Sequence, residues 1–145
     1  NMGLERDVEK GTISTNPENH ELMVRARQAK IAQIADSIPA LELINAQQYK
    51  VVLLVGWGST EGHLHAAANE LGCALAQFNY ICPLPRNTRE VLSQYKRIIV
   101  CELNTGQFAT YLRAQFPEIT FEQYNEIQGQ PFAIERIVNF VMNND

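Results

Sequence analysis

Apolar and polar residues fall into alternating blocks along this chain, and the clearest block is residues 50–62. Residues 51–55 read Val-Val-Leu-Leu-Val, an apolar and mostly β-branched run. Such a run is too short for a helix and too uniform for a half-exposed strand, so it predicts a strand buried on both faces of a parallel sheet. Gly-Trp-Gly follows, where the backbone can turn sharply, and Ser59 and Thr60 can then cap the first free N–H groups of a helix. The block predicts a strand, a tight turn and a helix start at the carboxyl edge of a sheet.

The same alternation of strand and helix patterns continues to the C-terminus. Further strands are predicted at residues 74–81, 97–101 and 120–124, and the polar character of the last indicates a place nearer an edge of the sheet. Four helices are predicted from apolar residues that recur with helical spacing: Leu64, Ala67, Ala68 and Leu71; Val91, Leu92 and Tyr95; Phe108, Ala109 and Leu112; Ile134, Ile137, Val138 and Val141. Because strands and helices alternate without repeats, the expected fold class is α/β with a mainly parallel sheet.

Polar residues and glycines indicate where several of these helices begin and end. Asn87 is followed three residues later by Glu90, which is the spacing of a capping box. Asn104 can cap a helix whose third position is Gln107. Gly72 is the predicted C-cap of the first helix of the domain, because glycine adopts the left-handed conformation that closes a helix.

The N-terminal third of the chain shows a different pattern. Residues 1–16 have no sustained period and are predicted to form an arm or an interdomain loop. Pro17 is suited to the first position of a helix, and a thin apolar stripe continues from there until Pro39 ends the element. We therefore expect a linker helix at residues 17–38 that leans on a neighbour, a loose extended approach, and an α/β domain at residues 46–145.

Composition and charge exclude several classes of protein. The formal net charge of −4 over 145 residues gives no basic surface for nucleic acid. No apolar run approaches the roughly 20 residues that a membrane helix needs, and the polar, acidic start does not resemble a signal peptide. Because the chain starts at Asn1 and not at Met, we expect it to be a piece of a longer protein.

The three cysteines predict a cytoplasmic protein with reduced thiols. Cys73, Cys82 and Cys101 are an odd number, each set among apolar residues and without a Cys-x-x-Cys pair. Iron–sulfur clusters and structural zinc usually need about four ligands with close pairs among them. We therefore expect no metal site on this chain.

The glycine-bearing loop does not match the known nucleotide fingerprints. A dinucleotide fingerprint that starts at Gly56 would need glycine at its sixth position, where Glu61 stands, and the expected downstream carboxylate is missing. No Gly-Lys-Ser or Gly-Lys-Thr follows, so the loop is not a P-loop. Two interpretations remain open: a tight strand-to-helix turn capped by Ser59, or a site at residues 58–62 that binds an anion or a partner chain.

Four residues other than the glycines are candidates for a catalytic, metal-binding or interface role. Glu102 lies at the carboxyl end of the third predicted strand, where sites in open α/β sheets collect, but the sequence places no second acid, His or Lys beside it. His63 and His65 are two residues apart on a helix and do not share a face, which disfavours a joint metal site. Trp57 can anchor an interface or cap the end of the sheet. We find no defensible Ser–His–Asp, Cys–His or paired-carboxylate arrangement.

Five motifs in order resemble one known family. The sequence contains Gly-Trp-Gly-Ser-Thr-Glu-Gly at 56–62, Pro-Leu-Pro at 83–85, Glu-Leu-Asn-Thr-Gly-Gln at 102–107 and Gln-Gly-Gln-Pro-Phe at 128–132, after Gly-Leu-Glu-Arg-Asp at 3–7. Together they resemble the C-terminal domain of the α subunit of 2-oxoacid:ferredoxin oxidoreductases, most closely the 2-oxoglutarate type. Met2 and Arg6 depart from the family's pattern. The resemblance covers nearly the whole chain.

The resemblance implies a function for the parent protein and a smaller role for this chain. The family oxidatively decarboxylates a 2-oxoacid with coenzyme A, which gives an acyl-CoA, carbon dioxide and reduced ferredoxin, and it uses thiamine diphosphate, magnesium and iron–sulfur clusters. The matching domain is similar to the C-terminal domain of transketolase, a three-layer α/β/α unit used largely for assembly. The implied partners are other domains and the β subunit, with ferredoxin met only through the whole complex. No catalytic or cofactor-binding residue is carried over.

Our leading hypothesis is thus an assembly domain that is inactive alone, and the alternative is a phosphate- or nucleotide-binding module that uses residues 58–62. The candidate interface or anion loops share one predicted position, the carboxyl edge of the sheet. They consist of Gly56, Trp57, Gly58, Ser59, Thr60, Gly62, Glu102, Asn104, Gly106, Gln107, Gln128 and Gly129.

Overall fold

The computed structural model describes residues 5–6, 13–14, 17–46, 50–103, 106–126 and 133–143. Within these ranges, the main body is a five-stranded sheet with the strand order β3-β5-β4-β6-β7. The strands are β3 (Leu43–Ile44), β4 (Val52–Trp57), β5 (Ala74–Phe78), β6 (Arg97–Glu102) and β7 (Glu122–Asn125). β4 pairs in parallel with β5 and β6, and β6 pairs in parallel with β7. The predicted α/β class with a mainly parallel sheet is confirmed.

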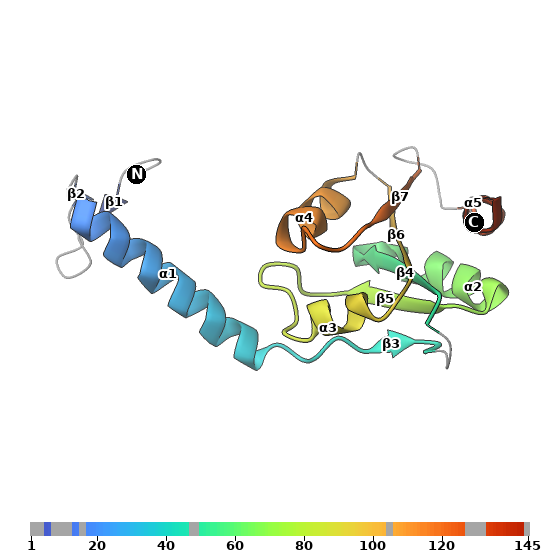
Figure 1. The fold of residues 1–145 in the computed structure, drawn as a ribbon, viewed down its shortest axis with the longest axis horizontal. Helices are drawn as coiled ribbons and strands as arrows, with labels where there is room; N and C mark the ends of the chain where they lie inside the picture. The colour runs from blue at the N-terminus through green and yellow to red at the C-terminus, as the bar shows by residue number, and fades with distance from the viewer. Residues whose placement is uncertain are drawn as a thin grey trace.

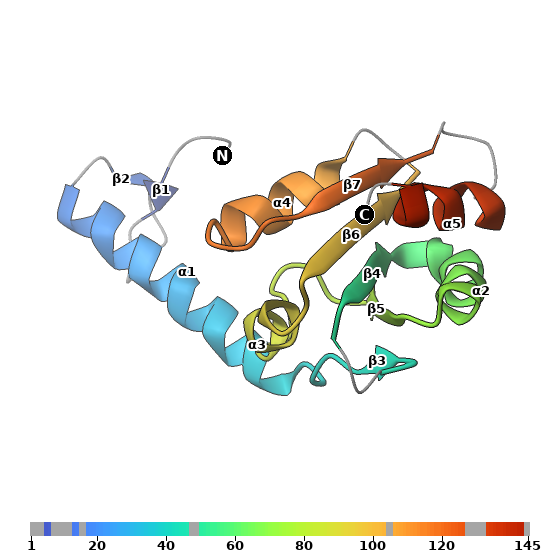
Figure 2. The ribbon, with the colours of Figure 1, turned by 45° about the vertical axis from the view of Figure 1, so that its right-hand side comes forward.

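In the described part of the chain, four helices cover the two faces of this sheet. They are α2 (Glu61–Leu71), α3 (Thr88–Ser93), α4 (Gln107–Gln115) and α5 (Ile134–Asn143). Figure 2 shows α2 and α5 on one side of the sheet and α3 and α4 on the other. Alternate residues of β4 follow this division, because Leu53 and Val55 join the core under α3 and α4 while Leu54 joins the core under α2 and α5. The three-layer α/β/α architecture is therefore built from strands buried on both faces.

The helical stripes predicted from spacing face the core. Leu64, Ala67 and Ala68 of α2 are fully buried, and Gly72 ends that helix in the left-handed conformation with φ 66°. The Gly72 N–H donates to the carbonyl of Asn69 at 3.3 Å, which satisfies a free carbonyl at the helix end. In α4 and α5 the predicted positions Phe108, Ala109, Leu112, Ile137 and Val141 are likewise buried.

The Arg97 side chain joins three C-terminal elements of the body. The Arg97 guanidinium in β6 donates to both carboxylate oxygens of Glu122 in β7, at 2.8 and 2.9 Å. It also donates to the carbonyl of Val141 in α5 at 2.9 Å. The Arg97–Glu122 pair is bidentate and only partly exposed, so it holds the edge strand β7 more firmly than a fully exposed pair could. The bond to Val141 holds α5 in the same way.

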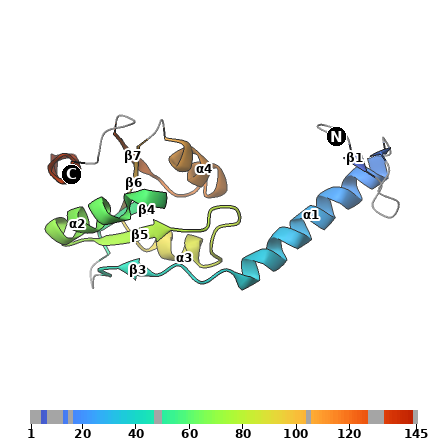
Figure 3. The same cartoon turned by 180° about the vertical axis from the view of Figure 1, so that it is seen from behind.

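The N-terminal helix α1 (Pro17–Ser37) extends away from the body, with a short ribbon of β1 (Glu5–Arg6) and β2 (Ile13–Ser14) at its far end (Figures 1 and 3). The helix begins at Pro17 and ends before Pro39, as predicted. Asp36 near its end forms an ion pair with Arg86 of the body at 2.5 Å. The pairing of β1 with β2 was missed, because two-residue strands carry no readable period.

Three boundaries differ from the sequence-based prediction. The approach to the sheet contains β3, which pairs antiparallel with β5 through Leu43 and Ile44 and was predicted only as an extended segment. β5 ends at Phe78 and not at residue 81, because the chain leaves the sheet before the prolines. β7 spans 122–125, two residues later than the predicted start, and lies at the sheet edge as expected.

Asn87 stands at the N-cap position of α3, as predicted, but its side chain does not form the predicted capping box. Its side chain makes no hydrogen bond to the N-terminus of α3. Instead the amide oxygen accepts from the Leu41 N–H at 2.8 Å, and the amide nitrogen donates to the Leu41 carbonyl at 3.0 Å. The side chain thereby takes the place of a neighbouring strand for one residue of the segment that leads into β3.

Replacing Asn87 by Ala should therefore loosen the segment before β3 and leave α3 intact. We expect the Leu41 amide to exchange its hydrogen at least tenfold faster, because about 1–2 kcal/mol of local stability is lost with its acceptor. Amide hydrogen exchange of residues 40–44 and of α3 measures this. Faster exchange confined to α3 would contradict the assignment and restore the cap.

Among the helices that the structure describes, none is both long and apolar enough to cross a bilayer.

Candidate functional site

The strand order reverses direction at β4, so the switch point lies between the carboxyl ends of β4 and β6, where open α/β sheets usually bind ligands. Trp57 ends β4 there and packs on Phe108 of α4, with ring centroids 6.0 Å apart. Phe108 also meets Phe78, the last residue of β5, edge-on at 5.3 Å. Trp57 therefore caps the end of the sheet with one part of its half-buried ring.

Glu102 ends β6 at the same edge, and its carboxylate is used by the fold. The side chain is 1% exposed. One carboxylate oxygen accepts from the Phe108 N–H at 2.7 Å, and the other accepts from the Ala109 N–H at 3.1 Å. These are N–H groups of the first turn of α4, so Glu102 caps that helix from a neighbouring strand. The N-cap position of α4 is Gly106. Asn104, which was predicted to cap this helix, lies outside the described residues, so a bond from its side chain stays a prediction.

The loop after β4 is a short 3-10 helix, Gly58–Thr60, that continues directly into α2. Thr60 does not cap α2: its hydroxyl donates to the carbonyl of Trp57 at 3.1 Å. The Gly58 carbonyl accepts from the Gln77 side chain at 2.9 Å. Glu61 places a carboxylate in the first turn of α2, which suits the positive end of the helix dipole and repels an anion. The geometry thus weighs against the anion-binding alternative at residues 58–62.

Of the remaining predicted site residues, the structure describes some in full and others in part or not at all. Gly106 is buried, with φ +89°, and a Cβ there would lie 2.0 Å from the Gln123 amide nitrogen, so this position requires glycine. Gln107 begins α4 and is exposed. Gly62 is exposed on α2. Of Ser59 only the backbone is described, and Gln128 and Gly129 lie outside the described residues, so their place at this edge stays a prediction.

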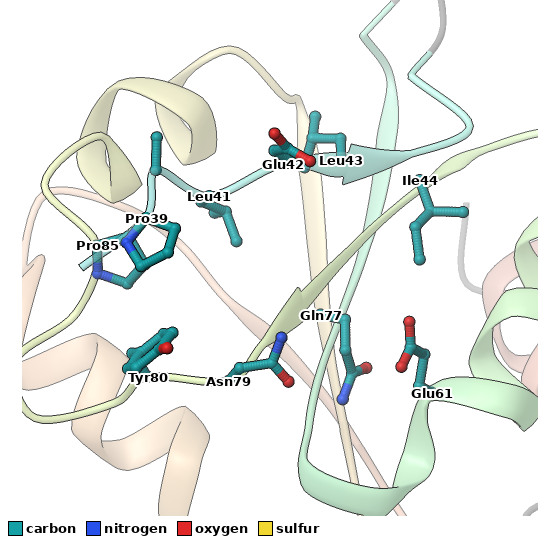
Figure 4. Close-up of a pocket in the computed structure, with 11 residues that line it drawn as sticks. Pro39, Leu41, Glu42, Leu43, Ile44, Glu61, Gln77, Asn79, Tyr80 and Pro85 are labelled. Carbon is teal, nitrogen blue, oxygen red and sulfur yellow. The ribbon is translucent and has the colours of Figure 1, made fainter.

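A cavity of about 630 Å³ lies at the carboxyl end of β5 and was not predicted from the sequence. Figure 4 shows it between the segment that leads into β3 and the residues that end β5. It is lined by Pro39, Ala40, Leu41, Glu42, Leu43, Ile44, Glu61, Gln77, Asn79, Tyr80 and Pro85. The one signal in the sequence was the change from apolar to polar residues within the predicted strand 74–81.

The histidines and cysteines do not gather into a metal site in the described part of the chain. His63 and His65 are both exposed on α2. Among the described residues, no group of three or more His, Cys, Asp or Glu side chains could hold a metal ion. Cys73 and Cys101 are buried, whereas Cys82 is exposed.

The three thiols should differ sharply in reactivity. Burial raises the pKa of the Cys73 thiol to about 11 and moves the pKa of the Cys101 thiol well above its usual range. Only the thiolate is nucleophilic, so we expect iodoacetamide at about pH 8 to modify Cys82 at least tenfold faster than the other two. Mass spectrometry of the native and the urea-unfolded chain measures this; equal native labelling of Cys73 would contradict its burial.

The same shift has a consequence at high pH. The folded state keeps the Cys73 thiol protonated up to about pH 11, whereas in the unfolded chain it ionises near its ordinary pKa of 9.0. This contribution to stability is therefore fully present below about pH 9 and is lost as the pH rises towards 11.

One curated protein matches nearly the whole length of this chain. No protein-family model matches this chain. The 2-oxoglutarate oxidoreductase subunit KorA of Mycobacterium tuberculosis (strain ATCC 25618 / H37Rv) is 38% identical over an alignment of 144 positions, which covers 96% of this chain and 22% of that protein. The resemblance to 2-oxoacid:ferredoxin oxidoreductases is confirmed.

A solved structure agrees with this relative. It is the 2-oxoglutarate:ferredoxin oxidoreductase from Magnetococcus marinus, determined with 2-oxoglutarate, coenzyme A and succinyl-CoA bound. The match has a TM-score of 0.83 and 30% sequence identity, and it covers 97% of this chain and 26% of that chain. This chain is thus similar, over nearly its whole length, to a segment of about a quarter or less of each oxidoreductase polypeptide.

Proposed function

We propose that this chain is the C-terminal assembly domain of the α subunit of a 2-oxoglutarate:ferredoxin oxidoreductase. The observation that carries the proposal is the 38% identity over 96% of the chain to the subunit KorA. The parent enzyme would oxidatively decarboxylate 2-oxoglutarate with coenzyme A, which gives an acyl-CoA, carbon dioxide and reduced ferredoxin. We further propose that it works in the cytoplasm.

The division into parts follows the same proposal. Residues 1–16 form an arm or interdomain loop, residues 17–38 the linker helix, and residues 46–145 the transketolase C-terminal-like domain. The extended position of α1 in Figures 1 and 3 supports the linker role. So do its exposed apolar side chains, since Leu22 is 54% exposed and Ile31 and Ile34 are each 45% exposed, and a neighbouring domain could cover them.

The geometry of the carboxyl edge supports assembly over chemistry. Glu102 is the acid best placed for catalysis, because it lies at the end of a strand. Both of its carboxylate oxygens accept hydrogen bonds from the N-terminus of α4. Trp57 packs on Phe108 at the switch point itself. A general acid or base must reach a proton of the substrate. The Glu102 carboxylate cannot do so, because it is 1% exposed and both of its oxygens accept hydrogen bonds from α4.

The three cysteines of this chain do not fit an iron–sulfur cluster of the parent complex. Two of the three thiols are buried in the core and the third is exposed, so they cannot share an iron–sulfur cluster. We therefore propose that the clusters lie in other parts of the parent complex. We propose the same of the thiamine diphosphate, magnesium and coenzyme A that the resemblance implies, and we derive no reaction step on this chain.

The isolated chain tests this assignment. We expect purified 1–145 to carry less than about a tenth of an iron per chain, since structural clusters need roughly four ligands, and to give no 2-oxoglutarate-dependent reduction of ferredoxin. Thermal shift with coenzyme A, nucleotides and phosphate should move the melting temperature by under about 1 °C. Stoichiometric iron, turnover, or a shift of several degrees with phosphate compounds would contradict the assembly role.

A further inference from the structure

The helix α1 packs against the sheet-bearing body only near its C-terminal end, within the part of the chain that the structure describes. Figures 1 and 3 show the helix leaving the body at this end. Every residue from Arg25 to Ile34 is exposed, whereas Ala35 and Ile38, at the end of the helix and just after it, are half-buried. A helix that packs along a domain buries one face at every third or fourth position. Packing against the body therefore does not hold α1 over most of its length.

The contacts that set the angle between α1 and the body are weak. Asp36 of α1 pairs with Arg86, but their side chains are 57% and 64% exposed, and pairs that exposed contribute little to stability. Ile31 lines a cavity of about 400 Å³ together with Leu84 and Phe116 of the body, so the two surfaces do not pack closely there. An exposed ion pair and an unfilled cavity do not fix the direction of a 21-residue helix.

The chain between α1 and the body is free over two residues. On the helix side, the Ile38 N–H still donates to a carbonyl of α1 at 3.3 Å. On the body side, the Asn87 side chain binds both the N–H and the carbonyl of Leu41. Pro39 and Ala40 between them are exposed and, in the described part of the chain, make no backbone hydrogen bond. Hinges consist of such short segments at the end of an element.

We propose that residues 39–40 are a hinge between α1 and the body, and that other domains of the parent enzyme set its angle, a second part that rests on the proposed function. The solved oxidoreductase supports that part. Its match has a TM-score of 0.83 over 97% of this chain, which includes most of α1, so helix and body keep this arrangement within a longer polypeptide. In the isolated chain α1 samples a range of angles. The body can then adjust to its neighbours during assembly without unfolding α1.

Distances between two spin labels, measured by pulsed electron paramagnetic resonance, test the hinge in the 145-residue chain. The pair across the hinge is Gln28→Cys/Glu90→Cys, and the matched pair within the body is Glu70→Cys/Glu90→Cys, all at exposed positions. Both carry Cys82→Ser, because that native thiol is exposed while the other two are buried. The distance distribution across the hinge should be at least about twice as wide as the one within the body. Equal widths overturn the hinge.

Two variants place the motion at the joint. Pro39→Gly frees the φ angle that the proline ring fixes, and it should widen the distribution across the hinge by at least about half while the pair within the body stays unchanged. Arg86→Gln removes the exposed ion pair and should change the width by less than about a fifth. No widening in Pro39→Gly, or a doubled width in Arg86→Gln, overturns the assignment of the hinge to residues 39–40.

The assembled enzyme tests what sets the angle. The α subunit is labelled at the same two positions through a non-natural side chain, so that its cysteines stay unlabelled, and is bound to the β subunit. The width across the hinge should then fall to that of the pair within the body. A width as large as in the isolated chain overturns the role of the other domains. Failure of the proposed function gives a different result, namely no complex, while the isolated chain still reports on the hinge.

Discussion

Replacing Glu102 by Leu should destabilise the chain by about 3 kcal/mol, since two N–H groups at the start of α4 lose a charged acceptor inside the core. The carboxylate is 1% exposed and accepts from Phe108 and Ala109 at 2.7 and 3.1 Å, so no water can take its place without opening the helix end. For a chain of this length the melting temperature should fall by roughly 10 °C. Urea unfolding followed by circular dichroism measures the free energy directly.

Two companion variants separate the cap from mere loss of charge. Glu102→Gln keeps one acceptor oxygen and should cost about half as much as Leu. Glu90→Leu removes an exposed carboxylate from α3 and should stay within about 0.5 kcal/mol of the parent chain. If Glu102→Leu unfolded at the same urea concentration as the parent, the cap would have no energetic role and Glu102 would again be available for chemistry.

Replacing Gly56 by Ala should cost about 2–3 kcal/mol, because the added methyl group has no room. A Cβ at Gly56 would lie 2.2 Å from the Leu64 Cδ1 and 2.9 Å from both the Gln77 amide oxygen and the Thr60 hydroxyl oxygen. The first contact joins β4 to α2 in the core, so the fully buried Leu64 side chain would have to leave its packed position. Urea unfolding should show a lower midpoint with an unchanged slope.

Gly62 provides the matched control in the same glycine-bearing stretch. It lies within α2, and a Cβ there would meet nothing within 4 Å. Gly62→Ala should therefore stabilise the chain by about 0.5–1 kcal/mol, because alanine is the better helix former. Opposite signs for the two substitutions are the expected result. A loss of stability in both would mean that the stretch acts as one constrained loop, as an anion cradle would require.

Patterns of side-chain type were enough to predict the elements that are buried. The run 51–55 became β4, and the spacing of Phe108, Ala109 and Leu112 gave the core face of α4. These predictions held because burial on both faces of a strand, or on one face of a helix, dictates composition at every position.

Features that depend on a single long-range hydrogen bond could not be predicted from the local sequence pattern. Asn87 and Glu90 have capping-box spacing, yet Asn87 binds the backbone of Leu41, 46 residues earlier in the chain. Glu102 acts on α4 from a strand, where no local rule of helix capping would place it. The cavity beside Gln77 depends on how far β3 stays paired, and two-residue strands leave no periodic signal.

We propose that residues 46–145 serve the assembly of a larger oxidoreductase. The most direct measurement is co-expression of the β subunit with the α subunit, either complete or cut before residue 46, followed by size-exclusion chromatography and 2-oxoglutarate-dependent reduction of ferredoxin. We expect the truncated α subunit to fail to form the complex, with activity lowered at least about a hundredfold because the reacting groups are no longer held together. A truncated subunit that still assembles and turns over at the full rate would contradict it.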